Sequence, residues 1–282
     1  NDSSLCENIA YQGGTVREEG KVDKSRGITF RDSKNIAVVG VDCLDLQYAL
    51  IFWRVEGLEL SANQIRGVRT DAMRVQDCVA PVKVISNFVT DFGETLSHPD
   101  ALQLFQQERR LEGPVIAYNL FYRGNGPLFQ GVFIKDEGKK DLVSGAIIHD
   151  NIVIGSMNNA IQIWGDAKVE RNLTIGDFFI APGSTKPTTP IIAVGRFTGT
   201  LKNNQAAMYS MDGKQIPPPE GNLLVPRMST EDAKAFAEKW RAANAEADNQ
   251  LAEETNDPVR LEIARISEDL DALSARLKAL LA

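Results

Sequence analysis

The sequence predicts an all-β right-handed parallel β-helix, followed by a C-terminal α-helical segment that ends in a coiled coil. Three observations support this prediction. Short segments of alternating polarity recur about every 30 residues, an asparagine recurs with them, and helical periodicity replaces the repeat after residue 212. Self-similarity at a spacing of roughly 20 to 50 residues is typical of stacked repeat architectures.

The repeat is clearest in five segments between residues 71 and 194. Each begins with a small or polar residue and continues with an apolar–polar–apolar alternation, and aligned residues are spaced by 29, 30, 29 and 31 positions. A propeller blade needs four strands in roughly 40 residues or more, and sandwich strands would not repeat one column pattern at a fixed spacing. A coil of about 30 residues with two or three strands fits a parallel β-helix, whose coils stack roughly 4.8 Å apart. The aligned residues are Ala72, Ala101, Gly131, Ala160 and Ile191.

Asparagines precede branched or aromatic residues in a second set of segments, which lie between the first. An asparagine at a bend can adopt the left-handed conformation and bond to its own backbone, and stacked copies can bond to one another as a ladder. The alternative is that these asparagines only mark turns. We expect a ladder with the members Asn63, Asn87, Asn119, Asn151 and Asn172.

Composition shifts divide the chain into four regions. Residues 1–26 are polar and predict an irregular lead-in or a partial N-terminal coil, and residues 27–212 carry the β-helix. Residues 213–228 include three consecutive prolines, which indicate a linker. Residues 229–282 predict two helices, the first beginning at Ser229 or Thr230.

The second helix is expected to begin at Asp257-Pro258, an N-cap followed by proline at the first helical position. Its apolar residues are spaced alternately by four and three positions, which is a heptad pattern. This pattern favours a self-associating coiled coil, and the alternative is one amphipathic helix that folds back on the β-helix. The heptad residues are Val259, Ile263, Ile266, Leu270, Leu273, Leu277 and Leu280.

Composition narrows the classes of partner. The net charge of -7 argues against a nucleic-acid partner. No apolar run approaches the roughly 20 residues that span a bilayer, and no signal peptide is recognisable. The chain starts at Asn1 rather than Met, so the sequence leaves open what precedes it. Cys6, Cys43 and Cys78 predict free thiols, and no metal or cofactor site is expected.

Alternation along the main repeat separates inward from outward side chains. The apolar pairs that begin with Met73-x-Val75 are expected to face inward. Three outward columns remain, and the first contains only alanine and glycine, which predicts the floor of an open groove: Ala72, Ala101, Gly131 and Ala160. The other two columns supply the predicted glycan-binding residues Trp53, Arg74, Gln76, Gln103, Phe105, Phe133, Gln162 and Trp164.

These outward residues have the chemistry of a sugar-binding face. Amides satisfy sugar hydroxyls, aromatic rings stack on the apolar faces of sugars, and Arg or Lys suits uronates. The alternative is that a loop or a neighbouring subunit covers the aromatic rings.

A polar cluster near these strands is the candidate catalytic site. It comprises His98 and Asp100 before one strand, with Lys135 and Asp136 at the end of the next. A base, an acid and a cation are what β-elimination from a uronate requires. Asp136 with Glu137 is alternatively a carboxylate pair for hydrolysis or a pair of calcium ligands. The simplest alternative is a turn followed by a solvated loop.

The repeats resemble a known group of proteins. The segments SNFVTDF, HPDALQLF, YNLFYRGNG, HDNIVIGSMNNAIQIWG and RNLTIGD are similar to the repeats of pectate-lyase-like right-handed β-helix proteins, over residues 27–209. That superfamily includes polysaccharide lyases, hydrolases, uronan epimerases and phage tailspikes.

Together with the heptad pattern, the resemblance implies a homotrimeric tailspike or tail-fibre protein. Such a protein would lie on a virion surface or outside the cell, bind host-surface polysaccharide and contact other particle proteins. The second interpretation is a polysaccharide lyase, epimerase or hydrolase that acts on acidic glycan. The third is a structural connector without a ligand.

Overall fold

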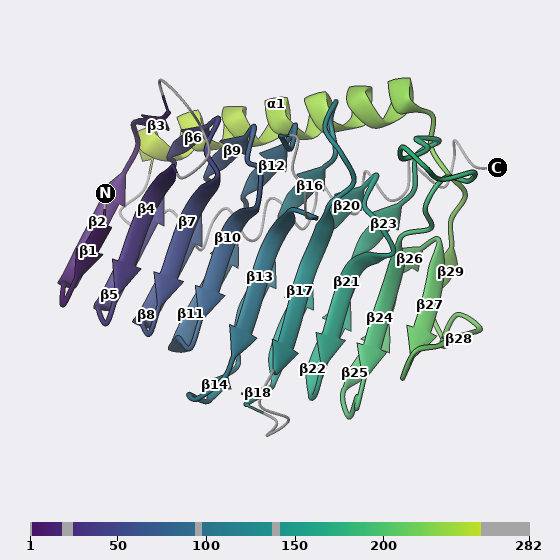
Figure 1. The fold of residues 1–282 in the computed structure, drawn as a ribbon, viewed down its shortest axis with the longest axis horizontal. Helices are drawn as coiled ribbons and strands as arrows, with labels where there is room; N and C mark the ends of the chain where they lie inside the picture. The colour runs from purple at the N-terminus through teal and green to yellow at the C-terminus, as the bar shows by residue number, and fades with distance from the viewer. Residues whose placement is uncertain (1, 19–24, 94–97, 137–141, 255–282) are drawn as a thin grey trace. The chain divides into compact units, whose positions relative to one another are not determined.

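The computed structural model describes residues 2–18, 25–93, 98–136 and 142–254. The chain divides into two compact units, residues 1–233 and residues 234–282. The strands all belong to the first unit, where almost all of them run parallel in stacked sheets (Figure 1).

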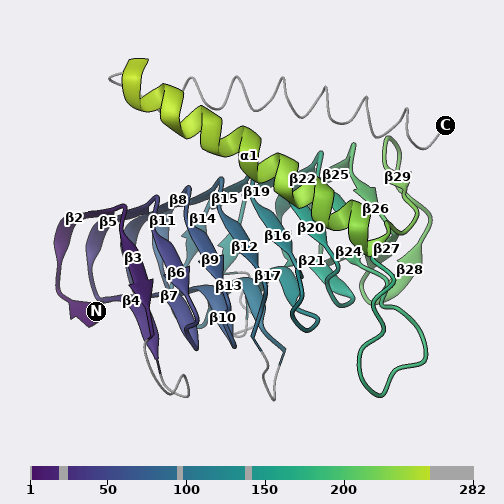
Figure 2. The ribbon, with the colours of Figure 1, turned by 90° about the horizontal axis from the view of Figure 1, so that it is seen from above.

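Successive stretches of chain add one strand to each of three sheets in turn (Figure 2). Among the described strands, every pairing is parallel except that of β27 with β28. This arrangement is compatible with the predicted β-helix.

Sheet A contains, in order, β1 (Asp2–Ser4), β4 (Arg26–Arg31), β7 (Tyr48–Trp53), β10 (Asp71–Gln76), β13 (Asp100–Gln106), β17 (Gln130–Asp136), β21 (Asn159–Trp164), β24 (Ile191–Gly195), β27 (Met208–Met211) and β28 (Lys214–Ile216). Sheet B contains β2 (Glu7–Gln12), β5 (Lys34–Val39), β8 (Glu56–Ser61), β11 (Val79–Ile85), β15 (Val115–Ala117), β19 (Ala146–His149), β22 (Ala167–Glu170) and β25 (Thr200–Lys202). Sheet C contains β3 (Thr15–Arg17), β6 (Asp42–Leu44), β9 (Gln64–Arg66), β12 (Phe88–Thr90), β16 (Leu120–Tyr122), β20 (Ile152–Ile154), β23 (Leu173–Ile175), β26 (Gln205–Ala206) and β29 (Leu223–Leu224). A fourth sheet pairs β14 (Leu111–Glu112) with β18 (Val143–Ser144).

The stack extends at both ends beyond residues 27–212, and its N-terminal end agrees with the partial coil that was one of the two expectations for residues 1–26. β1, β2 and β3 pair with β4, β5 and β6, so the polar N-terminal region contributes a coil. Residues 213–228, which the prolines suggested to be a linker, contain β28 and β29 and therefore belong to the stack. Prolines mark where a chain cannot donate a backbone hydrogen bond, but they do not show whether the residues between them pair.

The C-terminal helix α1 spans Thr230–Glu254. Ser229 caps it, because the backbone N–H of Asp232 donates to Ser229 Oγ at 3.0 Å. The start of this helix is therefore where the sequence predicts it. The second predicted helix, with its heptad residues from Val259 to Leu280, lies outside the described residues.

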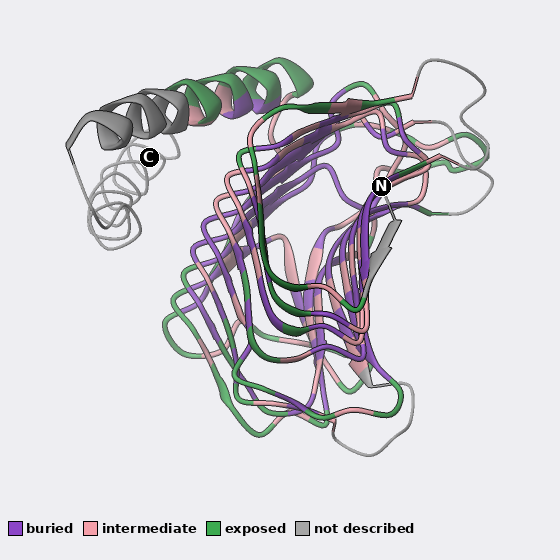
Figure 3. Ribbon diagram, turned by 90° about the vertical axis from the view of Figure 1, so that its left-hand side faces the viewer, coloured by how far each residue is buried: buried purple, intermediate pink, exposed green. Residues whose placement is uncertain are grey.

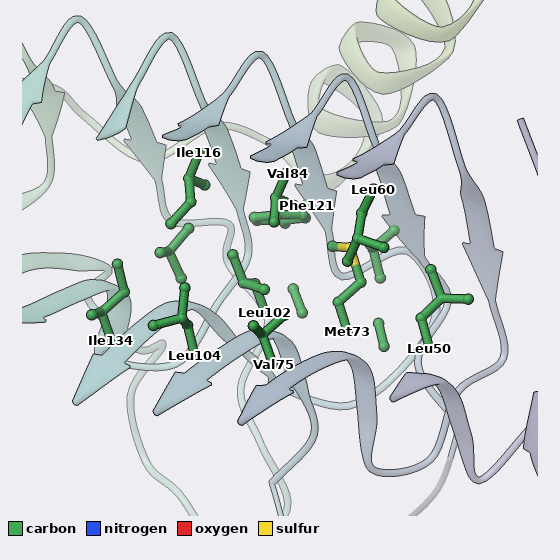
Figure 4. Packing of buried hydrophobic residues seen from close by; sticks show 14 of the residues in the cluster. Leu50, Leu60, Met73, Val75, Val84, Leu102, Leu104, Ile116, Phe121 and Ile134 are labelled. Carbon is green, nitrogen blue, oxygen red and sulfur yellow. The ribbon is translucent and has the colours of Figure 1, made fainter. Parts of the chain in front are cut away.

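The interior of the stack is formed by apolar side chains from all three sheets. The predicted inward positions of sheet A are buried, and they meet side chains from sheets B and C (Figure 4). Val84 and Ile116 come from sheet B, and Phe121 from sheet C. The inward residues predicted from the alternation are Met73, Val75, Leu102, Leu104, Val132, Ile134, Ile161, Ile163, Ile192 and Val194.

The column of alanine and glycine is buried, so the prediction that it floors an open groove is wrong. Ala72, Ala101 and Ala160 are all 0% exposed. A Cβ built on Gly131 would lie 2.1 Å from the carbonyl oxygen of Ala160 and 2.9 Å from Val153 Cγ1, in sheet C. The second residues of these strands therefore still occupy the tight corner between sheets C and A, where only small side chains fit. Strict alternation begins one residue later.

The predicted asparagine ladder is present and longer than expected. Asn87 Nδ2 donates to Asn119 Oδ1 at 2.9 Å, and Asn119 Nδ2 donates to Asn151 Oδ1 at 2.8 Å. The same pattern continues through Asn204 to Asn222. One detail of the prediction is wrong, because the residue before each asparagine carries the left-handed backbone. These residues include Ala62, Ser86, Tyr118, Asp150 and Arg171.

Candidate functional site

The outward face of sheet A presents two columns of polar and aromatic side chains in register. In the first column Arg74, Gln103, Phe133 and Gln162 pair rung by rung across β10, β13, β17 and β21. All four are of intermediate exposure. Buried and intermediate residues alternate in this way along the strands of the stack (Figure 3). Neighbouring rungs lie roughly 4.8 Å apart. The strands therefore hold these side chains as a continuous row on one face.

The second column is partly covered by guanidinium groups. Trp53 pairs with Gln76, Gln76 with Phe105, and Phe105 with Lys135. The guanidinium carbons of Arg31 and Arg54 each lie 4.3 Å from the Trp53 ring centroid. Cations at this distance interact favourably with the ring, and they occupy positions where a sugar would stack.

Trp164 continues this column on β21, and the cation beside it lies further from its ring. Its ring lies against Gly195 on the next strand, since a Cβ built there would be 3.0 Å from Trp164 Cδ2. The guanidinium carbon of Arg196 is 5.8 Å from the Trp164 ring centroid, further than the cations beside Trp53. Trp164 is therefore the tryptophan of this face best placed to stack on a ligand.

Two buried carboxyl groups lie at the start of the same strands. Asp71 and Asp100 are paired in register on β10 and β13, and they are only 4% and 1% exposed. Gln130 occupies the same position on β17 and is 6% exposed. We call Asp71, Asp100 and Gln130 the acid column.

The predicted catalytic residues His98 and Asp100 are close together. His98 Nδ1 lies 3.2 Å from Asp100 Oδ1, and Gln103 Nε2 donates to Asp100 Oδ2 at 3.0 Å. Gln130 Nε2 lies 3.2 Å from His98 Nδ1. Gln130 Oε1 is buried and has no hydrogen-bond partner within the described part of the chain.

The rest of the predicted catalytic cluster lies at the other end of the strand. Lys135 is in register with Phe105 and Asp136 with Gln106, whereas Asp100 is in register with Gln130. Five residues of strand separate the two ends, which corresponds to about 16 Å. Lys135 therefore does not meet His98 and Asp100 around one substrate atom.

Burial dominates the electrostatics of the acid column. It raises the pKa of Asp71 to about 7, and the neighbouring Asp100 contributes in the same direction. Burial also raises the pKa of Asp100 to about 7, although Arg74 and the hydrogen bond from Gln103 oppose it. Desolvation and a like charge both disfavour a carboxylate, so the neutral form is favoured here.

Arg74 connects the acid column to the outward face. Its Nη1 lies 3.6 Å from Asp71 Oδ2, and its guanidinium carbon lies 5.0 Å from the Phe105 ring centroid. Phe105 is only 6% exposed, whereas its register neighbours Gln76 and Lys135 are of intermediate exposure. Arg74 thus contributes to covering a ring that the alternation places outside.

Sequence reasoning missed Asp71 and Gln130. The signal was present, because Asp71 and Asp100 begin two segments that align with each other, DAMRV and DALQL. An aspartate at the start of a strand ordinarily suggests a turn. Only the register and the burial show that the two carboxyl groups face each other.

Within the described residues, no group of three His, Cys, Asp or Glu side chains is arranged to hold a metal ion. The one described helix is not apolar enough over the length needed to cross a membrane. No protein-family model, curated protein or solved structure matches the chain.

Proposed function

We propose that the chain is a right-handed parallel β-helix of the pectate-lyase-like type, and that it forms a homotrimeric, fibrous surface protein of a phage-like particle. In this proposal the outward face of sheet A binds host-surface polysaccharide. The heptad pattern from Val259 to Leu280 supplies the trimerisation segment.

The observation that carries the proposal is the register of the outward columns. Amide, aromatic and cationic side chains recur on adjacent strands, and most of them are partly exposed. A row of this kind suits an extended polymer better than a small molecule, because successive rungs present polar and aromatic side chains at a regular spacing along the stack. Amides bond sugar hydroxyls and rings stack on sugars.

A retention assay tests this function. The full chain is passed over immobilised polygalacturonate, alginate and dextran, as wild type, Trp164→Ala and Phe178→Ala. We expect Trp164→Ala to weaken retention at least about tenfold, because it removes the tryptophan of the face whose ring lies furthest from a guanidinium. Phe178, which is 60% exposed on a loop, is the matched aromatic control and should leave retention unchanged.

Other outcomes identify the alternatives. Equal retention of Trp164→Ala and wild type would exclude Trp164 from the binding face. Retention of none of the polymers would favour a structural connector. Release of unsaturated or reducing sugar ends during incubation would indicate cleavage, and a monomer in light scattering of the full chain would contradict the trimer.

A further inference from the structure

The acid column is not explained by the fold or by the outward face alone. The apolar interior and the asparagine ladder hold the coils together without it. Two carboxyl groups in adjacent rungs, each at least nine-tenths buried, are costly when both are ionised. Gln130 Oε1 adds another acceptor beside them, without a donor from any described residue. The column therefore places side by side two carboxyl groups that repel each other when both are ionised, and protonation relieves that repulsion.

The carboxyl groups of Asp71 and Asp100 are too deeply buried for a sugar to reach them. Asp71 and Asp100 expose almost no surface, so a sugar ring has no direct contact with them. A proton needs no such access. One proton shared between two adjacent carboxyl groups removes their mutual repulsion and supplies a donor, as happens in other carboxyl pairs.

Arg74 connects the protonation of the carboxyl pair to the outward face of sheet A. Its guanidinium forms an ion pair with Asp71, and it also lies over the Phe105 ring. When Asp71 is ionised, attraction holds the guanidinium between the carboxylate and the ring. When Asp71 is neutral, that attraction is lost and only the weaker contact with the ring remains.

We propose that the Asp71–Asp100 pair is a proton-operated switch that determines whether Arg74 covers Phe105, and thereby sets the affinity of the outward face for glycan. The inference rests on the proposed function of that face. The ionised pair keeps Phe105 covered, and protonation of both carboxyl groups, which removes the charge that attracts the guanidinium, releases Arg74 and makes the ring available for stacking.

The charged and polar groups around the pair determine how the exposure of Phe105 changes with pH. Asp71 faces Asp100, Arg74 and His98, and Asp100 faces Arg74, His98 and Gln103. Since the pKa of each carboxyl is raised to about 7, the neutral form prevails below neutral pH and the ionised form above it. Phe105 should therefore be more exposed at pH 6 than at pH 8.

The first experiment measures Phe105 without any glycan. The full chain is labelled with 4-fluorophenylalanine, the Phe105 resonance is assigned with Phe105→Leu, and its solvent isotope shift is followed from pH 5.5 to 8.5. Wild type should show exposure that falls as pH rises. Asp71→Asn and Arg74→Gln should remain exposed throughout. His98→Gln should retain the response, which excludes the imidazole as its source.

A pH-independent Phe105 resonance in wild type would overturn the switch. So would an unchanged response in Asp71→Asn. Circular dichroism of each variant shows whether it has folded. If Asp71→Asn does not fold, Arg74→Gln decides the same point, because it removes the cover and leaves the carboxyl pair intact.

The second experiment measures binding at pH 6 and pH 8 to whichever of the three polymers wild type retains. We expect wild type to bind about threefold to tenfold more tightly at pH 6, the size of one stacking contact, and Asp71→Asn to bind equally at both. A fluorine response without retention of any polymer would retain the switch and reject the glycan function. Retention without a fluorine response would reject the switch alone.

Discussion

Two columns of stacked polar side chains run along this molecule, and they differ in whether their members satisfy one another. In the asparagine ladder each amide both donates and accepts, so Asn119 donates to Asn151 and accepts from Asn87. In the acid column Asp71 and Asp100 present acceptors to each other, and Gln130 Oε1 lacks a donor from the described residues.

The difference shows what each column contributes. A carboxamide has donors and acceptors in one group and can be stacked indefinitely, which makes the ladder a structural element. Ionised carboxylates carry only acceptors and like charge, so stacking them costs free energy unless a proton is shared. The ladder is therefore insensitive to pH, and the acid column is sensitive to it.

The largest effect is expected from interrupting the ladder. Asn119→Ala leaves the backbone N–H of Asn87 without the Asn119 Oδ1 acceptor and removes the donor to the carbonyl of Val84. Because both groups are buried, we expect the free energy of unfolding to fall by about 3 kcal/mol. Urea unfolding followed by circular dichroism measures it.

Asn125→Ala is the control for this change. Asn125 is exposed and its side chain makes only a 3.5 Å contact with Asp91, so its loss should cost less than about 0.5 kcal/mol. Equal effects of the two substitutions would show that the ladder contributes nothing beyond a surface asparagine.

A smaller, pH-dependent effect is expected from the acid column. The folded state holds the pKa of Asp71 at about 7, above the ordinary value of 3.8, so it binds more protons than the unfolded state between these values. The contribution of Asp71 to the free energy of unfolding of wild type therefore falls as pH rises from about 4 to 7. Asp71→Asn does not titrate and should be more stable than wild type at pH 8 by about 1 to 2 kcal/mol.

The measurement compares urea midpoints of wild type and Asp71→Asn at pH 5 and pH 8. The difference in stability between Asp71→Asn and wild type should be smaller at pH 5, because Asp71 of wild type is already protonated there. Asp45→Asn is the control, since the Asp45 side chain is 58% exposed and pairs only loosely with Arg17. A variant that destabilises the protein equally at both pH values would contradict the raised pKa.

The same contrast explains what the sequence could predict. The inward residues and the asparagines follow from periodicity, because each coil repeats the chemistry of the last and one coil determines the next. Asn87 and Asn119 could therefore be assigned to a ladder without knowing any distance. The partly exposed row from Arg74 to Gln162 follows from the same alternation.

The remaining features depend on where periodicity fails. Ala72 and Ala101 are buried because the chain is still turning a corner, which alternation within a strand does not reveal. The environment of Asp71 depends on side chains from another segment, including Asp100 and His98. The heptad from Val259 to Leu280 stays a prediction, since it lies outside the described residues.

The smallest effect is expected where the acid column contains an amide. Gln130 is a buried carboxamide, as Asn119 is, but within the described residues its Oε1 has no partner and its Nε2 contacts His98. Gln130→Met removes the unpaired oxygen and keeps the approximate volume of the side chain. We expect the free energy of unfolding to change by less than about 1 kcal/mol, since removing an unsatisfied group offsets the lost contact.

The comparison that isolates this point is Gln130→Met against Asn119→Leu under the same urea conditions. Both substitutions replace a buried amide with an apolar side chain, so the hydrophobic gain is similar in the two. A large loss for Asn119→Leu with little change for Gln130→Met would show that hydrogen-bond saturation, rather than burial of an amide, separates the two columns. A loss of about 3 kcal/mol for Gln130→Met would mean that Gln130 Oε1 is bonded in solution, and that the acid column is as saturated as the ladder.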